Sequence, residues 1–286
     1  MADQPRASVT PPPVAELFRL DGRVALVTGG AGLLGARYCG ALLEAGGRVV
    51  IGDLDGQRAR QLAAELDPER ALGVGLDVAD EASVADVVER AVGRFGRLDI
   101  LVNNAALTVR GGGERLLQDY FAPFETYPRA VWDLAVSVNL TGMVLCAQAA
   151  GRQMLRQGGG VVVNIASTYG VVAPDQRLYE GVKSPYTGVG FNTPVSYAVT
   201  KTAVLGLTRY LATYWGRQNI RVNALTPHGV YDNHDETFVR NFAYRSPLGR
   251  MARNDEYRGA LLFLVSDASS YMTGANLVVD GGWTAW

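Results

Sequence analysis

Short apolar runs alternate with longer segments of helical period along most of the chain. The runs are rich in Val, Ile and Leu and end in Gly, Asp or Asn, which is typical of parallel strands buried on both faces. They read RVALVT, RVVIGD, LGVGLDV, DILVNN, GGVVVNIAS, IRVNALTP and ANLVVDGG. Amphipathic segments lie between them, for example residues 131–156 and 196–216. One helix per crossover predicts an α/β fold, a doubly wound parallel sheet of about seven strands with helices on both faces.

The same pattern marks a boundary only near the N-terminus. Residues 1–15, MADQPRASVTPPPVA, are polar, rich in Pro and without period, so we expect a flexible tail there. No repeat or linker interrupts residues 16–286, and that length is compatible with one large core. We therefore expect a single domain over residues 16–286.

Composition and charge exclude several classes of function. The 286 residues carry a net charge of −1, which leaves no basic excess for binding nucleic acid. Apolar runs such as residues 161–165 are too short for a membrane span or a signal peptide core. Cys39 and Cys146 lie in helix-like apolar patterns without metal or disulfide spacing, so we expect reduced core residues. These features predict a cytoplasmic protein that binds neither nucleic acid nor membrane and holds no metal.

A glycine-rich turn follows the first predicted strand. In TGGAGLLG, Gly30, Gly32 and Gly35 satisfy the spacing G-x-G-x-x-G, with a strand before it and a helix after it. Glycine lets backbone N–H groups approach a pyrophosphate, and the helix start adds a favourable dipole. We predict a dinucleotide site contacted by Gly29, Gly32, Leu34 and Gly35; the alternative is a glycine-rich turn without a ligand.

Acidic residues end the second and third predicted strands. Asp53 can accept hydrogen bonds from the adenosine ribose, and a 2′-phosphate would meet its carboxylate as a like charge, so NAD is preferred over NADP. Leu54 follows it as a further cofactor contact. The alternative is that Asp53 only caps the helix beginning near Gly56. Asp77 and Val78 are candidates for the adenine pocket, although Asp77 could equally be a cap.

The order of motifs resembles that of the short-chain dehydrogenase/reductase family. TGGAGLLG, LDV, NNAA, VNLTG, NIAS, YAVTK and VVDGG follow one another in the family's order, from about residue 20 to the end. The resemblance implies a homotetramer built on residues 131–156 and 196–216. It also implies a catalytic tetrad and further cofactor contacts, which are Asn139, Ser167, Tyr197 and Lys201 for the tetrad, and Asn104, Ala105, Tyr197, Lys201, Pro227 and Val230 for the cofactor.

Hydride chemistry requires such residues independently of the family name. Oxidising a carbinol also removes the hydroxyl proton, and a free tyrosine with a pKa near 10 is mostly protonated at neutral pH. Lys201 lies one helical turn after Tyr197, so its charge can stabilise the phenolate; the charge of oxidised nicotinamide and partial desolvation are expected to help. By resemblance, Ser167 bonds the reacting oxygen, and Asn139 interrupts a helix and holds a water that connects Lys201 to solvent.

Two local departures from the family pattern stand out. Gly32 shifts the glycine spacing toward that of the sugar-nucleotide epimerases and dehydratases, but only WTAW follows VVDGG, where that branch has a larger domain. In TPHGV, His228 occupies the usual glycine position. We expect its ring to point to solvent, with a role as a donor to the substrate as the alternative.

A third departure is the insertion at residues 174–194, between the Ser strand and the Tyr helix. It mixes aromatic residues with Asp175, Arg177, Glu180 and Lys183, groups suited to a polyhydroxylated ligand. The sequence YGVVAP…LYEG in and just before this insertion resembles that of a subgroup linked to bacterial surface-glycan and flagellin-sugar biosynthesis. We predict a substrate lobe; the alternative is a subunit contact or a lengthened loop.

A second long connection covers residues 107–128 and opens on the same side as the insertion. Two enlarged loops at one mouth suggest a deeper pocket than a small ketone needs. Four arginines could meet an anionic group on the substrate, although each could equally be a solvated surface charge: Arg110, Arg115, Arg129 and Arg177.

These features predict an NAD-dependent dehydrogenase acting on a secondary alcohol or ketone of a sugar or sugar derivative. Its expected partners are a small carbohydrate-like substrate and further copies of the same chain. One alternative is a sugar-nucleotide epimerase or dehydratase with bound NAD, which rests on the spacing at Gly32. Another is a non-catalytic NAD-binding sensor, although such a protein need not keep Ser, Tyr and Lys together.

Overall fold

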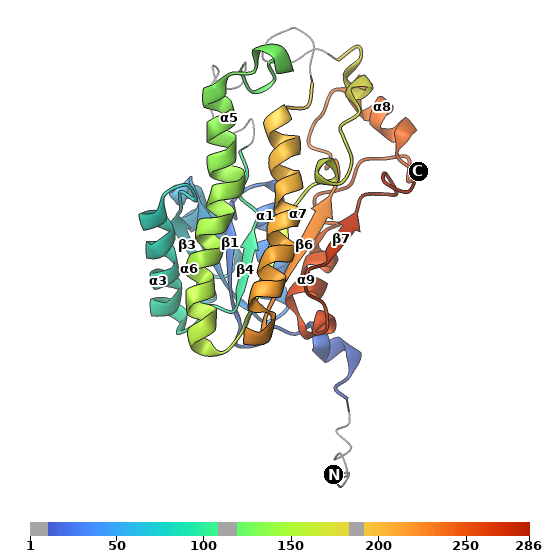
Figure 1. Cartoon of the computed structure of the whole chain (residues 1–286). Helices are drawn as coiled ribbons and strands as arrows, with labels where there is room; N and C mark the ends of the chain where they lie inside the picture. The colour runs from blue at the N-terminus through green and yellow to red at the C-terminus, as the bar shows by residue number, and fades with distance from the viewer. Residues whose placement is uncertain (1–10, 108–118, 183–191) are drawn as a thin grey trace, which may run out of the picture.

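Seven parallel strands form one sheet in the order β3-β2-β1-β4-β5-β6-β7 (Figure 1). The structure is a computed structural model, and it describes residues 11–107, 119–182 and 192–286. Each strand falls within or beside one of the predicted apolar runs, so the predicted sheet is confirmed. The strands are β1 (Val24–Thr28), β2 (Arg48–Asp53), β3 (Ala71–Gly75), β4 (Ile100–Asn103), β5 (Gly160–Ile165), β6 (Ile220–Pro227) and β7 (Asn276–Val279).

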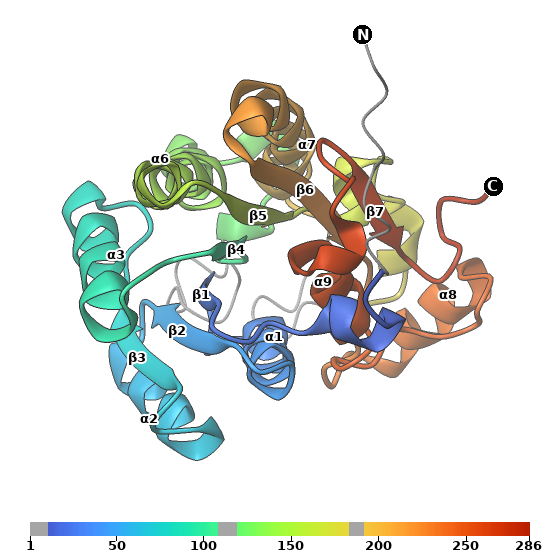
Figure 2. The same cartoon turned by 90° about the horizontal axis from the view of Figure 1, so that it is seen from below.

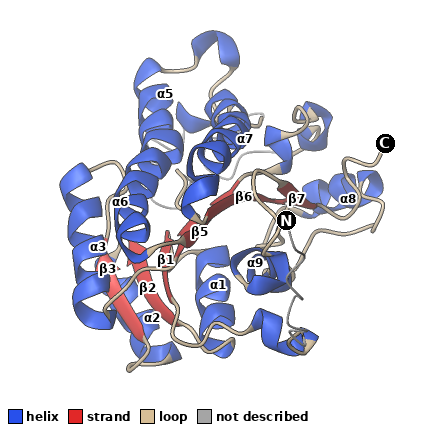
Figure 3. Ribbon diagram, turned by 60° about the horizontal axis from the view of Figure 1, so that its bottom comes forward, coloured by secondary structure: helices blue, strands red, loops and turns tan. Residues whose placement is uncertain are grey.

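Helices cover both faces of this sheet (Figures 2 and 3). One face carries α1 (Leu33–Glu44), α2 (Gly56–Leu66) and α9 (Arg258–Val265). The other carries α3 (Glu81–Phe95), α6 (Gly142–Gln157) and α7 (Val195–Trp215). Two more helices lie toward the carboxyl ends of the strands, α5 (Arg129–Val136) and α8 (Glu236–Arg245) (Figure 1). Short 3₁₀ turns cover Val14–Phe18, Phe124–Thr126, Thr168–Gly170, Gln176–Tyr179, Gly216–Gln218 and Asp267–Ser269.

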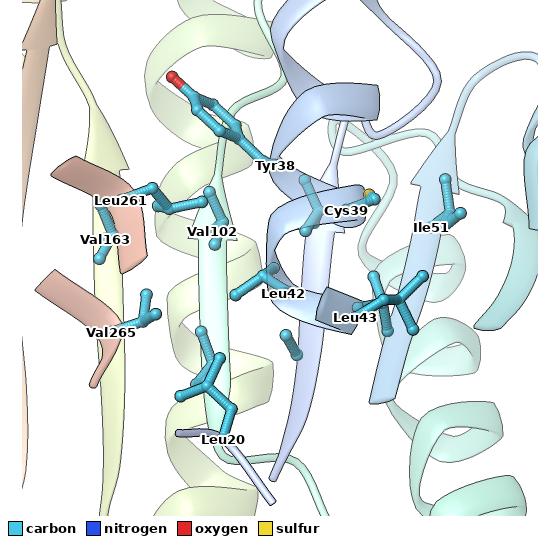
Figure 4. Close-up of a cluster of buried hydrophobic side chains, with 14 of the residues drawn as sticks. Leu20, Tyr38, Cys39, Leu42, Leu43, Ile51, Val102, Val163, Leu261 and Val265 are labelled. Atoms are coloured by element: carbon cyan, nitrogen blue, oxygen red, sulfur yellow. The ribbon is translucent and has the colours of Figure 1, made fainter. Parts of the chain in front are cut away.

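The helices are held by apolar side chains from alternate positions of the strands. Figure 4 shows Tyr38 and Leu42 of α1 together with Val102 of β4 and Leu261 of α9 in one cluster. Both cysteines are free and buried in these two cores, as predicted. Burial in apolar surroundings raises the pKa of the Cys39 thiol, which keeps it protonated.

The longest helical segment runs from Arg129 to Gln157 through α5 and α6. Its length and a mean hydropathy of 1.6 over its most apolar window would allow it to cross a membrane. In the fold it lies beside α7 along the sheet (Figures 1 and 2). A core helix of a globular domain has the same composition, and we interpret this segment in that way.

A 3₁₀ turn begins at Val14, within the segment expected to be a flexible tail. Residues 1–10 of that tail lie outside the described residues, whereas Val14 and Ala15 already belong to the turn Val14–Phe18. This turn lies at the lower end of the molecule in Figure 1, opposite the carboxyl ends of the strands.

The sheet reverses its winding between β1 and β4. From β1 the chain adds β2 and β3 on one side, then crosses to β4 and adds β5, β6 and β7 on the other. In open parallel sheets the loops on either side of such a switch point diverge and leave room for a ligand at the carboxyl ends of the strands. The loops after β1, β2, β3, β4, β5 and β6 carry most of the predicted site residues, and the others lie on helical segments.

Candidate active site

The glycine turn after β1 has the shape that a phosphate group needs. Gly29 adopts φ +59°, a conformation that side-chain-bearing residues rarely take. A Cβ on Gly35 would lie 2.2 Å from the carbonyl oxygen of Gly29, so only glycine lets α1 start this close to the turn. The first intrahelical bond of α1 is from Ala36 N to Gly32 O. The preceding amides at the helix start therefore remain available to an anion.

Asp53 lies at the end of β2 beside this turn. Its Oδ2 accepts from the backbone N–H of Ala31 at 3.0 Å, and its Oδ1 accepts from Asp55 N at 3.1 Å. The cap of α2 is Asp55, which accepts from the amides of Gln57 and Arg58. The alternative in which Asp53 serves as that cap is therefore wrong. The carboxylate lies at the carboxyl edge of the sheet, in contact with the turn after β1.

The loops after β3 and β4 continue the same edge. Exposed Asp77 accepts from Ala79 N at 2.9 Å within a tight turn, while the cap of α3 is Asp80. Val78 is buried next to it. On the loop after β4, the side-chain amide of Asn104 donates to the carbonyls of Thr28 and Gly29, both at 3.0 Å.

Thr28 ties the turn after β1 to the turn after β4. Its hydroxyl accepts from the amides of Asn104 and Ala105 at 3.0 Å and is itself buried. The sequence reasoning did not select this residue, although it stands first in the motif TGGAGLLG. Thr28 therefore fixes the spacing of the two loops at the switch point.

Ser167 and Tyr197 meet at the carboxyl end of β5. Ser167 is 6% exposed, and its Oγ accepts from Tyr169 N at 3.2 Å. Burial raises the pKa of the Tyr197 phenol, and the neighbouring Ser167 hydroxyl lowers it, with burial the larger effect. The expectation that partial desolvation helps to form the phenolate is therefore wrong, because removal from water destabilises the charged form.

Lys201 lies below Tyr197 on α7 and is 2% exposed. Its Nζ donates to the carbonyl oxygen of Ile165 at 2.7 Å and lies 5.8 Å from the centroid of the Tyr197 ring. Burial lowers the pKa of the ammonium group to about 8. The helical spacing of four residues thus brings Tyr197 and Lys201 together as predicted, while Ile165 O orients the ammonium group.

Asn139 occupies a π-helical turn, Ser137–Thr141, between α5 and α6. This is the helix interruption that the resemblance implied. Its side-chain oxygen accepts from Leu107 N at 2.6 Å, and its amide nitrogen donates to the Thr200 hydroxyl at 3.2 Å. Asn139 therefore connects the loop after β4 to the residue that precedes Lys201, and its role in holding a water stays a prediction.

His228 differs from the expectation that its ring points to solvent. It is 8% exposed, and its ring centroid lies 4.3 Å from that of Trp283 and 4.8 Å from that of Phe242. Tyr169 meets it edge-on at 5.6 Å. Burial lowers the pKa of the imidazole to about 4, so the ring is neutral at pH 7. Long-range aromatic partners, which local sequence does not reveal, hold the ring inside.

Pro227 and Val230 flank this histidine at the end of β6. The Pro227 carbonyl accepts from the Thr168 hydroxyl at 3.3 Å, which ties the loop after β6 to the loop that carries Ser167. Val230 pairs with Ala252 in an isolated parallel bridge. Both residues therefore lie at the same edge of the sheet as Ser167 and Tyr197.

The insertion is described at residues 174–182 and 192–194, and its 3₁₀ turn Gln176–Tyr179 packs on α8. Leu178 is buried with Phe242, Met251 and Trp283, and Asp175 forms ion pairs with Arg177 and Arg245. Glu180 is exposed, and Lys183 lies outside the described residues.

Tyr179, an aromatic residue of the insertion, packs against α8. Its ring stacks on Phe238 of α8 with centroids 5.4 Å apart, which covers one of its faces. Its hydroxyl shares a hydrogen bond with that of Thr193 at 2.9 Å. Tyr186 and Phe191, two further aromatic residues of this insertion, lie outside the described residues.

The second long connection is described only in part, because residues 108–118, with Arg110 and Arg115, lie outside the described residues. Tyr120 is buried and donates to Leu107 O at 3.2 Å. The Tyr127 hydroxyl shares a 2.7 Å hydrogen bond with Ser196 Oγ, next to Tyr197. Arg129 pairs with Asp133 one turn further along α5 and is strongly exposed, so it behaves as a solvated surface charge.

Known proteins with similar sequences cover nearly the whole chain. The family model for short chain dehydrogenase matches residues 23–240. D-threitol dehydrogenase of Mycolicibacterium smegmatis is 37% identical over 278 residues, covering 93% of this chain and 95% of that protein. NAD-dependent glycerol dehydrogenase of Listeria innocua is 31% identical over 272 residues, covering 93% and 96% of the two chains.

Solved structures of short-chain dehydrogenases have the same fold as this chain. The crystal structure of a gluconate 5-dehydrogenase from Burkholderia cenocepacia, in complex with NADP and tartrate, is 33% identical and superposes with a TM-score of 0.82, covering 95% of this chain and 99% of that one. A short chain dehydrogenase from Leptospira borgpetersenii with bound NAD+ is 29% identical, with a TM-score of 0.80 and coverage of 99% and 100%. The chain therefore belongs to the short-chain dehydrogenase/reductase family and is an oxidoreductase that acts on CH–OH groups.

Proposed function

We propose that this protein is an NAD-dependent dehydrogenase that interconverts a secondary alcohol and a ketone on a sugar or sugar derivative. The observation that carries the proposal is the placement of Lys201, whose buried ammonium group lies 5.8 Å from the centroid of the Tyr197 ring at the carboxyl end of β5, the strand that leads to Ser167. The similar threitol, glycerol and gluconate dehydrogenases support a substrate with several hydroxyl groups.

Each residue of the proposed tetrad has a separate task. In oxidation, Tyr197 Oη takes the proton of the substrate hydroxyl while Ser167 Oγ hydrogen-bonds the same oxygen. Lys201 favours the phenolate by its charge. Asn139 holds α7 against the loop after β4 through Thr200. In reduction, the proton moves from Tyr197 to the forming alkoxide.

The residues around the switch point fit a nicotinamide dinucleotide, which when bound accepts or supplies the hydride. The turn at Gly29, Gly32, Leu34 and Gly35 would hold the pyrophosphate, because the amides of Leu34 and Gly35 at the start of α1 precede the first intrahelical bond and a Cβ at Gly35 would clash. The remaining contacts are proposed for the adenosine half, at Asp53, Leu54, Asp77 and Val78, and for the nicotinamide half, at Asn104, Ala105, Tyr197, Lys201, Pro227 and Val230.

The NAD preference rests on Asp53. A 2′-phosphate would replace ribose hydroxyl donors with a negative group facing this carboxylate, so NADP should be the poorer cofactor. Asp53→Ala should lower the ratio of kcat/KM with NAD to kcat/KM with NADP. Asp55→Ala is the matched control, since it removes the cap of α2, which typically costs about 1 kcal/mol of stability, and leaves the crevice intact. An equal or higher kcat/KM with NADP for the unmodified protein would contradict this part of the proposal.

The proposed reaction is tested by following NADH formation with a panel of alditols, hexitols and cyclohexanol, and ketone reduction in the reverse direction. Turnover of free NAD should accompany oxidation. Retention of tightly bound NAD without net NADH formation would instead support the epimerase or dehydratase alternative, for which the spacing at Gly32 is the only specific observation. NAD binding with neither reaction would support the sensor.

Three finer features belong to the same proposal. The insertion at residues 174–194 is proposed to act as a substrate lobe. The proposed relation to the surface-glycan and flagellin-sugar subgroup rests on the sequence motif YGVVAP…LYEG alone. The protein is proposed to act in the cytoplasm. We also propose a homo-oligomer assembled on α5, α6 and α7.

A further inference from the structure

The first turn of α7, which carries Tyr197, has no side-chain cap. Its N-cap residue is Pro194, and no side chain accepts from the free amides at this helix start. The amides of Tyr197 and Ala198 both donate to Pro194 O, at 3.2 Å and 3.4 Å. A capping side chain would satisfy such amides and fix the first turn. Contacts from other elements therefore have to fix it here.

Tyr127 supplies one such contact from the loop after β4. Its hydroxyl shares a hydrogen bond of 2.7 Å with Ser196 Oγ, and either hydroxyl can be the donor. Ser196 is 0% exposed, so water does not replace Tyr127 when this bond is lost. Since Ser196 directly precedes Tyr197, the bond acts one residue away from the proposed proton acceptor.

The other end of the same loop holds the same turn of α7. Leu107 N donates to Asn139 Oδ1 at 2.6 Å, and Asn139 Nδ2 donates to Thr200 Oγ1 at 3.2 Å. The Thr200 hydroxyl in turn donates to Ser196 O at 2.7 Å. The turn that carries Tyr197 is therefore held from both ends of the connection at residues 107–128.

The backbone and ring of Tyr127 are placed by their own surroundings. Tyr127 follows the 3₁₀ turn Phe124–Thr126, and its N–H donates to Phe124 O at 3.3 Å. Its ring lines a cleft of about 350 Å³ together with Phe124, Trp132 and Val195, the first residue of α7. A phenylalanine at this position would keep the ring in the cleft and lose only the bond to Ser196.

The position of this turn matters for proton transfer. The Tyr197 hydroxyl has to lie within hydrogen-bond reach of the substrate hydroxyl, and a misplacement of about 1 Å can slow a reaction by about 100-fold. Lys201, one turn further along α7, is already held by its bond to Ile165 O. A displaced first turn would therefore move Tyr197 relative to a fixed Lys201.

We infer that Tyr127 is a positioning residue for the proposed reaction, which holds the first turn of α7 through Ser196 and so places the Tyr197 hydroxyl for proton transfer. This inference rests on the proposed function. Tyr127 acts through Ser196 and has no part in holding the substrate or the cofactor. Loss of the bond should therefore slow the chemical step and leave the affinities for alcohol and NAD nearly unchanged.

The test is a double-mutant cycle with Tyr127→Phe, Ser196→Ala and the double variant. NADH formation is followed by stopped flow with saturating NAD and D-threitol, or with another alcohol of the panel if the protein turns it over faster. Each single variant should slow hydride transfer by about fivefold or more, with KM for the alcohol and Kd for NAD within about twofold. The double variant should stay within about twofold of the slower single variant, because both changes remove one bond, whereas independent losses would multiply to about 25-fold.

Two other tyrosines serve as matched controls for the loss of a hydroxyl. Tyr244→Phe, at an α8 position that is 93% exposed, should leave the rate of hydride transfer unchanged. Tyr120→Phe removes a hydroxyl from the same connection, but this one donates to Leu107 O and not to α7. It should therefore slow hydride transfer less than Tyr127→Phe does.

The outcomes separate the inference from the proposed function. Unchanged hydride transfer in both single variants, or a higher KM at an unchanged rate, would overturn the inference while the dehydrogenase assignment stands. Losses that multiply in the double variant, or an equal loss in Tyr120→Phe, would also overturn it, since the changes would then only loosen the loop. Absence of NADH formation by the unmodified protein with every alcohol of the panel would overturn the proposed function and the inference with it. Ser196→Ala keeps the test open if Tyr127→Phe does not fold.

Discussion

Burial acts against both titratable residues of the proposed catalytic pair. It raises the pKa of the Tyr197 phenol and lowers the pKa of the Lys201 ammonium to about 8. Both shifts favour the neutral forms, although the proposed reaction uses a phenolate beside a cation. The positive charge of oxidised nicotinamide is the further contribution that the proposed oxidation needs, so phenolate formation should depend on cofactor binding.

The role of Tyr197 is tested by Tyr197→Phe, which removes the hydroxyl and keeps the ring. We expect kcat/KM for alcohol oxidation to fall by at least about 100-fold, because no other described side chain replaces the proton acceptor. The affinity for NAD, measured by calorimetry, should change little. In the unmodified protein the oxidation rate should increase with pH, since the raised pKa of Tyr197 keeps the phenol protonated at neutral pH. Activity within about tenfold of the unmodified protein would exclude Tyr197 as the acid–base.

Lys201 should lower the stability of the cofactor-free protein at neutral pH. Its pKa falls from the ordinary 10.5 to about 8 on folding, so the unfolded chain holds a proton between these pH values that the folded chain has released. Stability due to this group therefore increases with pH from about 8 to 10.5 and is lowest below pH 8. The full penalty corresponds to roughly 3 kcal/mol, against which the bond to Ile165 O offsets about 1 kcal/mol.

Lys201→Met removes this penalty and also the activity. In urea unfolding at pH 7, the variant should be more stable than the unmodified protein by about 2 kcal/mol. The difference should shrink by pH 10, where the lysine is neutral in the folded protein. A variant that is less stable at pH 7, or an advantage that grows with pH, would contradict the assigned effect of burial.

At the scale of elements, the insertion is part of the wall formed by α8 and the C-terminal segment. Leu178 is 3% exposed in the cluster with Phe242 and Trp283. The side-chain amide of Asn241 on α8 donates to Leu178 O at 3.1 Å. The 3₁₀ turn of the insertion is therefore held against α8 by both side-chain packing and a hydrogen bond to its backbone.

Replacing residues 174–194 by a short Gly-Ser connection should reduce sugar kcat/KM much more than NAD affinity and leave the oligomer unchanged. The melting temperature should also fall, because α8 loses a buried partner. Leu178→Ala separates the two effects. It should destabilise by about 2–4 kcal/mol while the folded enzyme keeps its preference among sugars. If the shortened enzyme keeps its sugar kcat/KM but dissociates into smaller species, the insertion is an assembly element.

The elements that sequence predicted well are those whose determinants are local. Apolar runs bounded by turn residues located all seven strands, and the spacing of four residues between Tyr197 and Lys201 required only one helix. The position of His228 could not be predicted from local sequence. The two rings that it contacts belong to Phe242 and Trp283, which lie 14 and 55 residues further along the chain. Asp53 and Asp55 show the same limit, since either carboxylate could cap α2 and only the backbone path after β2 decides between them.

At the scale of the whole molecule, the outer side of α5, α6 and α7 carries exposed apolar side chains. Tyr210 and Tyr214 of α7 are 63% and 62% exposed and stack on each other with centroids 5.9 Å apart. Leu155 of α6 and Val199 of α7 are exposed as well. These helices lie side by side in Figure 1. Exposed apolar groups gathered on neighbouring helices are typical of a protein–protein interface.

We therefore predict that the protein sediments as a dimer or tetramer and that Tyr210→Glu combined with Tyr214→Glu shifts it toward smaller species. Two buried carboxylates would face their symmetry copies across an isologous contact, where like charges repel and lose their hydration. Tyr271→Glu, at a fully exposed position outside these helices, is the control and should sediment as the unmodified protein does. Sedimentation velocity at two protein concentrations measures the outcome. A monomeric unmodified protein, or a double variant of unchanged size, would show that another surface or none mediates assembly.

Since α7 also carries Tyr197 and Lys201, dissociation should lower kcat/KM in parallel with the loss of oligomer. Full activity of the monomer would show that the proposed active site is complete within one chain.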